Sequence, residues 1–128
     1  MKLVLDTNIV LDLWVFRDPG VDALRESLAA RKVTWLGTAA MRDELASVLS
    51  YEQIGARMTA VNVSTDEVLA AFDEHAMLVD CPPAATVKCR DPDDQKFIDL
   101  AVAHDALLLS KDAQVLKLRR KLAVARSL

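Results

Sequence analysis

The stretch "LVLDTNIVLDLW", residues 3–14, decides the fold that the sequence predicts. Three apolar residues lead directly into Asp6, and apolar character resumes at Ile9. The first run is short and continuous, as in a buried strand, whereas Ile9, Leu13 and Phe16 follow the spacing of one helix face. We therefore expect a strand at residues 2–5, a helix over residues 7–16, and a carboxylate at the junction between them.

The chain has 128 residues, of which 52% are hydrophobic, and this is enough for one compact core. We predict a single domain over residues 1–128. No run of 18 residues lacks a charge, which argues against a membrane span, and the N-terminus does not have the pattern of a signal peptide. Cys81 and Cys89 are therefore expected to be reduced thiols of a cytoplasmic protein.

The charge is distributed unevenly along the chain. The formal net charge is −3, yet residues 111–128 contain six basic residues against Asp112 alone, which gives +5 and leaves −8 for the rest. A basic segment beside an acidic body can hold phosphates with one part and cations with the other. A solvated helix end would explain the same basic residues.

Strand and helix patterns alternate along the sequence. Short apolar runs predict strands at residues 2–5, 33–37, 77–80 and 106–110, and a last strand is expected at 122–125. Helices are expected over residues 7–16, 21–30, 38–50, 64–76, 91–104 and 112–120, with N-caps at Thr38, Ser64 and Asp91. This alternation predicts an α/β fold, a three-layer α/β/α sandwich with a short, mainly parallel central sheet.

Four acids lie where the carboxyl ends of parallel strands meet, and ligands bind in such places. They are Asp6, Glu44, Asp94 and Asp112. Each has a structural explanation on its own, as a helix cap, a residue that offsets a helix dipole, or a surface residue at the edge of an apolar stripe. Four carboxylates together would repel one another, and two divalent ions remove this repulsion.

Hard oxygen ligands suit Mg²⁺ or Mn²⁺. Two such ions about 4 Å apart activate water and stabilise the leaving oxygen in phosphodiester cleavage. The four acids therefore predict a metal-dependent site for phosphodiester chemistry.

With these residues identified, the sequence resembles the PIN-domain nucleases. The resemblance rests on "LDTNI" at 5–9, "DEL" at 43–45 and "DPDDQKFIDLAVAHDALLLSKD" at 91–112, followed by an expected last strand. These blocks occur in the family's order and cover nearly the whole chain. The stretch "RDPDDQKFIDLA" at 90–101 resembles the branch that contains the toxins of toxin–antitoxin pairs (VapC-like).

The resemblance implies an endoribonuclease that depends on Mg²⁺ or Mn²⁺ and cleaves RNA phosphodiester bonds. It implies metal-binding, catalytic roles for Asp6, Glu44, Asp94 and Asp112, a supporting role for Asn8, and a similar role for Ser110, which stands where the family usually has Thr. The implied partners are an RNA substrate, a small antitoxin protein and a second copy of the chain in a homodimer. Basic residues would hold the flanking phosphates; the candidates are Arg90, Lys96, Lys117, Arg119, Arg120 and Lys121.

Other functions fit the sequence less well. A haloacid-dehalogenase-like phosphatase needs a second Asp two residues after the first, where this chain has Asn8. A receiver-like domain needs an acid doublet after the first strand, and there is none. A nuclease of the flap-endonuclease group would have more acids and a longer chain. The remaining alternative is a catalytically degenerate PIN domain that binds RNA or a protein.

Overall fold

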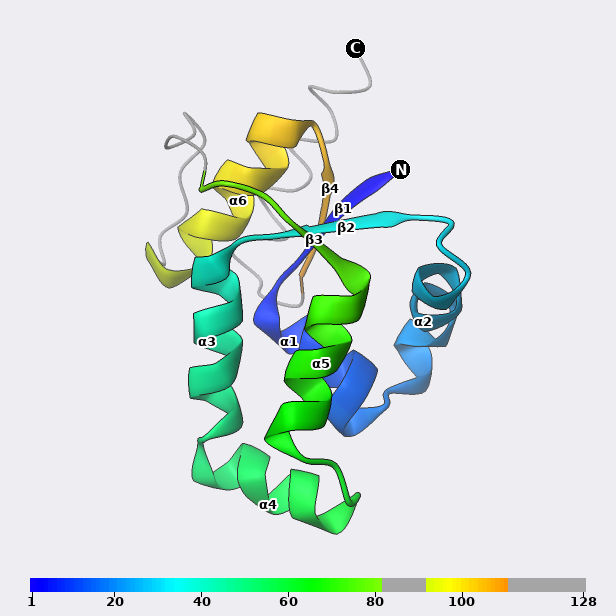
Figure 1. Cartoon of the computed structure of the whole chain (residues 1–128), viewed down its shortest axis with the longest axis vertical. Helices are drawn as coiled ribbons and strands as arrows, with labels where there is room; N and C mark the ends of the chain where they lie inside the picture. The colour runs from blue at the N-terminus through cyan, green and yellow to red at the C-terminus, as the bar shows by residue number, and fades with distance from the viewer. Residues whose placement is uncertain (82–91, 111–128) are drawn as a thin grey trace.

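The computed structural model describes residues 1–81 and 92–110, apart from the side chains of residues 92–94 (Figure 1). The helix predicted at 112–120 and the strand predicted at 122–125 lie outside the described residues. Cys81 is exposed. None of the described helices has the length and apolar character to cross a membrane.

In the part of the chain that the structure describes, a parallel sheet of four strands in the order β3-β2-β1-β4 forms the centre of the fold. The strands are β1 (Lys2–Leu5), β2 (Thr34–Gly37), β3 (Ala76–Leu78) and β4 (Leu107–Leu109). The α-helices are α1 (Thr7–Leu11), α2 (Asp22–Ala29), α3 (Ala39–Leu49), α4 (Glu52–Ala60), α5 (Thr65–His75) and α6 (Pro92–His104). A π-helical turn, η1 (Asp12–Phe16), and a 3-10 turn, η2 (Pro19–Val21), lie between α1 and α2.

Each face of the sheet is covered by helices, because alternate residues of a strand point to opposite faces. Leu3 and Leu5 of β1 pack in one core with residues of α1 to α5. Val4 between them packs in a second core, to which Phe97 and Ile98 of α6 belong. Figure 1 shows α6 across the sheet from α5. The three-layer α/β/α sandwich predicted from the sequence is confirmed.

The central position of β1 determines where the site lies. The chain passes from β1 to β2 on one side and later returns to β4 on the other side. The strand order therefore reverses at β1, and in open α/β sheets ligands bind at the carboxyl end of such a point. Asp6 follows β1 there, and the pairing of Leu5 with Leu109 places Ser110 at the same level of the sheet.

Two predicted helix starts are confirmed. The Thr38 hydroxyl accepts the Met41 backbone N–H at 3.2 Å, and the Ser64 hydroxyl accepts the Glu67 N–H at 3.1 Å. Each satisfies a backbone donor that the first helical turn leaves without a partner. The N-cap predicted at Asp91 lies outside the described residues.

Two local features differ from the sequence prediction. The helix expected over residues 7–16 is α-helical only to Leu11, and it continues as the π-turn η1 before Arg17 adopts a left-handed conformation with φ of 50°. Helix α4 has no counterpart among the predicted elements. Met58 is its one fully buried residue, so its sequence has little of the apolar periodicity that predicts a helix.

Aromatic packing links β2 to the helices on one face of the sheet. Trp35 lies edge-on to Phe72 of α5 with ring centroids 5.0 Å apart, and it stacks on Trp14 at 5.6 Å. Gly37 lies two residues after Trp35 in β2 and leaves room for Phe72. A Cβ atom at position 37 would lie 2.9 Å from the end of the Phe72 ring. The packing of α5 on the sheet therefore requires glycine at position 37.

We expect Gly37→Ala to lower the free energy of unfolding by about 1–3 kcal/mol, the usual cost of overpacking a filled core. Urea denaturation of the wild type and the variant measures this loss. Phe72→Leu removes the clashing ring atoms, so the double variant should lose less than the sum of the two single losses. Additive losses would contradict a direct clash between these residues.

Helices α3 and α5 are joined by a bidentate ion pair. Arg42 donates from Nε to Asp73 Oδ1 at 2.8 Å and from Nη2 to Oδ2 at 2.9 Å. These hydrogen bonds lower the pKa of Asp73 below its ordinary value of 3.8. Because the pKa is lower in the folded state, the pair stabilises the fold above the unfolded pKa and loses this effect as the pH falls through the folded pKa.

Arg42→Gln should therefore lower the Tm most near neutral pH, with a difference from the wild type that shrinks as the pH falls below about 3.8. Thermal melts of both proteins over this pH range measure the difference. Arg57→Gln, at an exposed position of α4, serves as the control for the removal of one positive charge. A Tm difference that does not change with pH would contradict the role of the ion pair.

Candidate active site

Asp6 is a buried carboxylate, with 3% of the residue exposed. Its Oδ1 accepts the Ile9 backbone N–H at 2.9 Å, and its Oδ2 accepts the hydroxyl of Ser110. Its own backbone N–H donates to the Leu109 carbonyl at 3.1 Å. One side chain thus caps α1 and also bonds to the residue that follows β4, so its orientation is fixed from both sides.

Glu44 brings a second carboxylate to this edge of the sheet from α3. Its Oε2 accepts the hydroxyl of Thr7 at 2.6 Å, and its Oε1 accepts Nζ of Lys96 at 2.8 Å. Because Thr7 follows Asp6 in the chain, the start of α1 contacts α3 directly. Asp43, the neighbouring acid on α3, is exposed.

Asp6 and Glu44 line one cavity of about 240 Å³. The cavity lies between the start of α1, the second half of α3 and the start of α4. Its described lining residues are Asp6, Thr7, Asn8, Leu11, Glu44, Val48, Tyr51, Gln53 and Ile54. Carboxylates, amides and apolar side chains therefore share a single opening.

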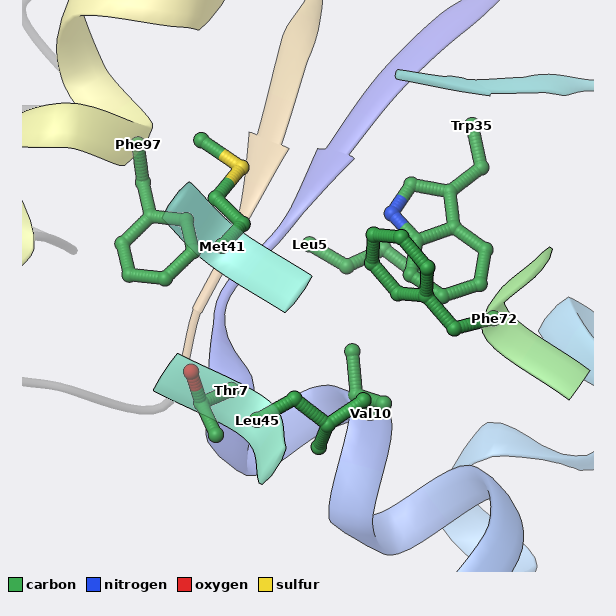
Figure 2. Close-up of a pocket in the computed structure, with 8 residues that line it drawn as sticks. All are labelled: Leu5, Thr7, Val10, Trp35, Met41, Leu45, Phe72 and Phe97. Carbon is green, nitrogen blue, oxygen red and sulfur yellow. The ribbon is translucent and has the colours of Figure 1, made fainter. Parts of the chain in front are cut away.

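The core beneath this site is closely filled. Figure 2 shows the residues around a second, much smaller cavity of about 10 Å³, with apolar and aromatic side chains on all sides and Thr7 at the border. Such a space is barely large enough for one water, and an apolar lining keeps it dry. The Thr7 hydroxyl has its hydrogen-bond partner in Glu44. Trp35 and Phe97 are buried in this core, with 2% exposure each.

The structure places the other predicted site residues as follows. Asn8 is exposed and lines the cavity, and Ser110 is buried against Asp6. Asp94 lies in the first turn of α6, and its side chain is not described. The remaining candidates lie outside the described residues: Asp112, Arg90, Lys117, Arg119, Arg120 and Lys121.

Lys96 was predicted to hold phosphates, and the structure places it on an acid of the site. Its Nζ lies 2.8 Å from Glu44 and 5.1 Å from the centroid of the Phe97 ring. Both charged side chains are about three-quarters buried. An ion pair with this burial is screened less by salt than a surface pair, so Lys96 provides Glu44 with a positive charge from within the chain.

The donors of this site are of the kind that divalent ions prefer. Asp6 and Glu44 provide carboxylate oxygens, the ligands of Mg²⁺ and Mn²⁺. Their hydrogen bonds are compatible with a further ligand, because an ionised carboxylate has about four lone-pair sites. Among the described side chains, no group of three acids, His or Cys forms a metal cluster. A two-ion site therefore needs ligands in addition to Asp6 and Glu44.

Sequence reasoning missed three polar residues that line the cavity: Thr7, Tyr51 and Gln53. A hydroxyl directly after a strand-end carboxylate is a usable signal for Thr7. An aromatic residue just after the end of a predicted helix is a weak signal for Tyr51. No local pattern indicates Gln53, because its place in the cavity depends on helix α4, which the sequence did not predict.

A comparison with protein families supports the sequence resemblance. The family described as the PIN domain matches residues 2–113, which is most of the chain and includes all four predicted acids. Comparisons with curated proteins and with solved structures gave no match.

The bond from Ser110 to Asp6 predicts the effect of two substitutions. Ser110→Ala should lower the free energy of unfolding by about 1.5–3 kcal/mol, because it removes a buried hydrogen bond to a charged group. Ser110→Thr should keep most of the stability, since its hydroxyl can make the same bond. Chemical denaturation of both variants measures the difference. Ser47→Ala, at an exposed position of α3, should change stability by less than about 0.5 kcal/mol, and an equally small effect at Ser110 would contradict the assignment.

Proposed function

Because the chain belongs to the PIN-domain family, a family of nucleases, we propose that it is an endoribonuclease that cleaves RNA phosphodiester bonds with Mg²⁺ or Mn²⁺. The observation that carries the proposal is the placement of Asp6 and Glu44 on one cavity at the carboxyl end of the central strand. This is the place where an open parallel sheet binds its ligand. Metal-assisted hydrolysis of a phosphodiester uses oxygen ligands of this kind.

In the proposed site the four acids Asp6, Glu44, Asp94 and Asp112 hold the ions. Two bound ions supply Lewis-acid activation of water and stabilisation of the leaving oxygen. Ser110 and the Ile9 N–H fix the orientation of Asp6, while Thr7 fixes Glu44. Orientation of this kind keeps ligand oxygens in position before the substrate arrives.

The resemblance of residues 90–101 to VapC-like toxins supports a finer proposal. We propose that the protein is the toxin of a toxin–antitoxin pair, forms a homodimer in the cytoplasm, and is silenced by a small antitoxin protein. A short neighbouring gene whose product binds this chain and blocks cleavage would support the pairing. Purified protein that stays fully active in the presence of every neighbouring gene product would contradict it.

One observation favours the alternative of a degenerate PIN domain that binds RNA or a protein without cleaving. Lys96 already neutralises Glu44, and a carboxylate paired in this way has less need of a metal ion. In this alternative the acids act as caps and ion-pair partners. The two functions differ in whether the purified protein binds divalent ions at this site.

We expect the wild type to bind Mn²⁺ or Mg²⁺ in calorimetry and to cleave a mixed single-stranded RNA only in their presence. Asp6→Asn should reduce metal affinity and cleavage by at least about 100-fold, because a ligand is lost and the acceptor for the Ile9 N–H is kept. Unchanged far-UV circular dichroism would show that the variant still folds.

Glu44→Gln and Asp43→Asn form a matched pair on helix α3. Both remove one negative charge, but only Glu44 lines the cavity, whereas Asp43 is exposed. Cleavage should fall in Glu44→Gln and stay at the wild-type rate in Asp43→Asn. A folded wild type that binds no metal at millimolar concentration would favour the binding module over the nuclease.

A further inference from the structure

We propose that the cavity beside Asp6 and Glu44 is a subsite for one nucleobase of the substrate, which stacks on Tyr51. The inference rests on the proposed function, because the base in this cavity belongs to the nucleotide next to the bond that the nuclease cleaves. Val48 lies one helical turn after Glu44 and Tyr51 lies roughly one turn further. The cavity thus leads from the acids to an aromatic ring.

Besides the acids and Tyr51, the cavity is lined by apolar side chains and by two amides. Leu11, Val48 and Ile54 provide apolar surface, and they come from α1, α3 and α4 respectively. Gln53 and Asn8 provide side-chain amides, each with a donor and an acceptor. Apolar faces with a few amide groups match a base, which has two flat faces and a polar edge.

Tyr51 is exposed to an extent unusual for a large ring, at 57%. Its backbone is nevertheless fixed at the junction of α3 and α4, where its N–H donates to the Val48 carbonyl at 3.0 Å and its carbonyl accepts the Gly55 N–H at 2.8 Å. An exposed ring that lines a cavity from a fixed backbone is a stacking platform of low entropic cost. Base–aromatic stacking is tolerant of sequence, because every base has a π-face.

The size and charge of the cavity favour a base over other ligands. No basic side chain is found among its described lining residues, so a free phosphate has no partner at the apolar part. A volume of about 240 Å³ lies below the roughly 300–1,000 Å³ of sites for drug-sized ligands, a size that suits one small ring system. An RNA chain cut at the acids necessarily presents such a group beside the cleaved bond.

The sequence offers a direct probe, because Tyr51 is the one tyrosine in the chain. Protein labelled with 3-fluorotyrosine therefore gives one ¹⁹F resonance, which reports on this position alone. We expect millimolar AMP, CMP, GMP or UMP with Mg²⁺ to shift the resonance in a saturable manner. Ribose 5-phosphate, which lacks the base, should leave it in place.

Substitutions test the same subsite on longer RNA. Tyr51→Leu should weaken the binding of a short single-stranded RNA by roughly 5- to 150-fold, the range that corresponds to about 1–3 kcal/mol of stacking. Tyr51→Phe should keep most of the affinity because the ring remains. Phe16→Leu is the matched control, since Phe16 is an exposed aromatic residue that does not line the cavity. Fluorescence anisotropy measures all three variants.

The outcomes separate this inference from the proposed function. A nucleotide-dependent ¹⁹F shift and a specific loss in Tyr51→Leu support the subsite, even if the wild type does not cleave RNA. Metal-dependent cleavage by the wild type with no shift, and equal RNA affinity in Tyr51→Leu and Phe16→Leu, would overturn the subsite and leave the nuclease intact. An equal shift with ribose 5-phosphate would also overturn it, because the ligand would then be the sugar phosphate.

Discussion

The buried carboxylate of Asp6 is the constraint on which the rest of the site depends. A charged group can be buried at low cost only when hydrogen bonds within the protein replace those that it made to water. Here the Ile9 N–H and the Ser110 hydroxyl make such bonds. Satisfying Asp6 therefore fixes where α1 begins and where the chain leaves β4, although these places are more than a hundred residues apart. The cavity takes its position from the same arrangement, since Thr7 and Asn8 follow Asp6 on α1.

Much of this arrangement follows from local patterns in the sequence. Short apolar runs predicted the strands, and hydroxyl N-caps at Thr38 and Ser64 predicted two helix starts, because both signals act over a few residues. The alternation of strands and helices then required a parallel sheet, and in a parallel sheet all carboxyl ends meet at one edge. The position of Asp6 at that edge was therefore predictable from the sequence alone.

The contacts between helices were not predictable in this way. Thr7 and Glu44 are 37 residues apart, and Lys96 and Glu44 are 52 apart. Whether such pairs meet depends on how α1, α3 and α6 cross the sheet, and a single sequence contains no local signal for these angles. Helix α4 was missed for a related reason. It packs mainly through Met58, so its periodicity is weak, and Tyr51 and Gln53 could not be placed without it.

Residue 6 is Asp, and a comparison with Asn shows which of its contacts depend on a carboxylate. As an N-cap, Asn is about as good as Asp, and an amide oxygen would accept the Ile9 N–H without the cost of burying a charge. Asp6 Oδ2 in addition accepts the Ser110 hydroxyl, which the amide nitrogen of Asn could not do, whereas the capping bond alone requires only an acceptor and no negative charge. The chain nevertheless buries a carboxylate there, next to Ser110 and on the same cavity as Glu44. Under the proposed function, this carboxylate has a second role as a ligand of a divalent cation at the carboxyl end of β1.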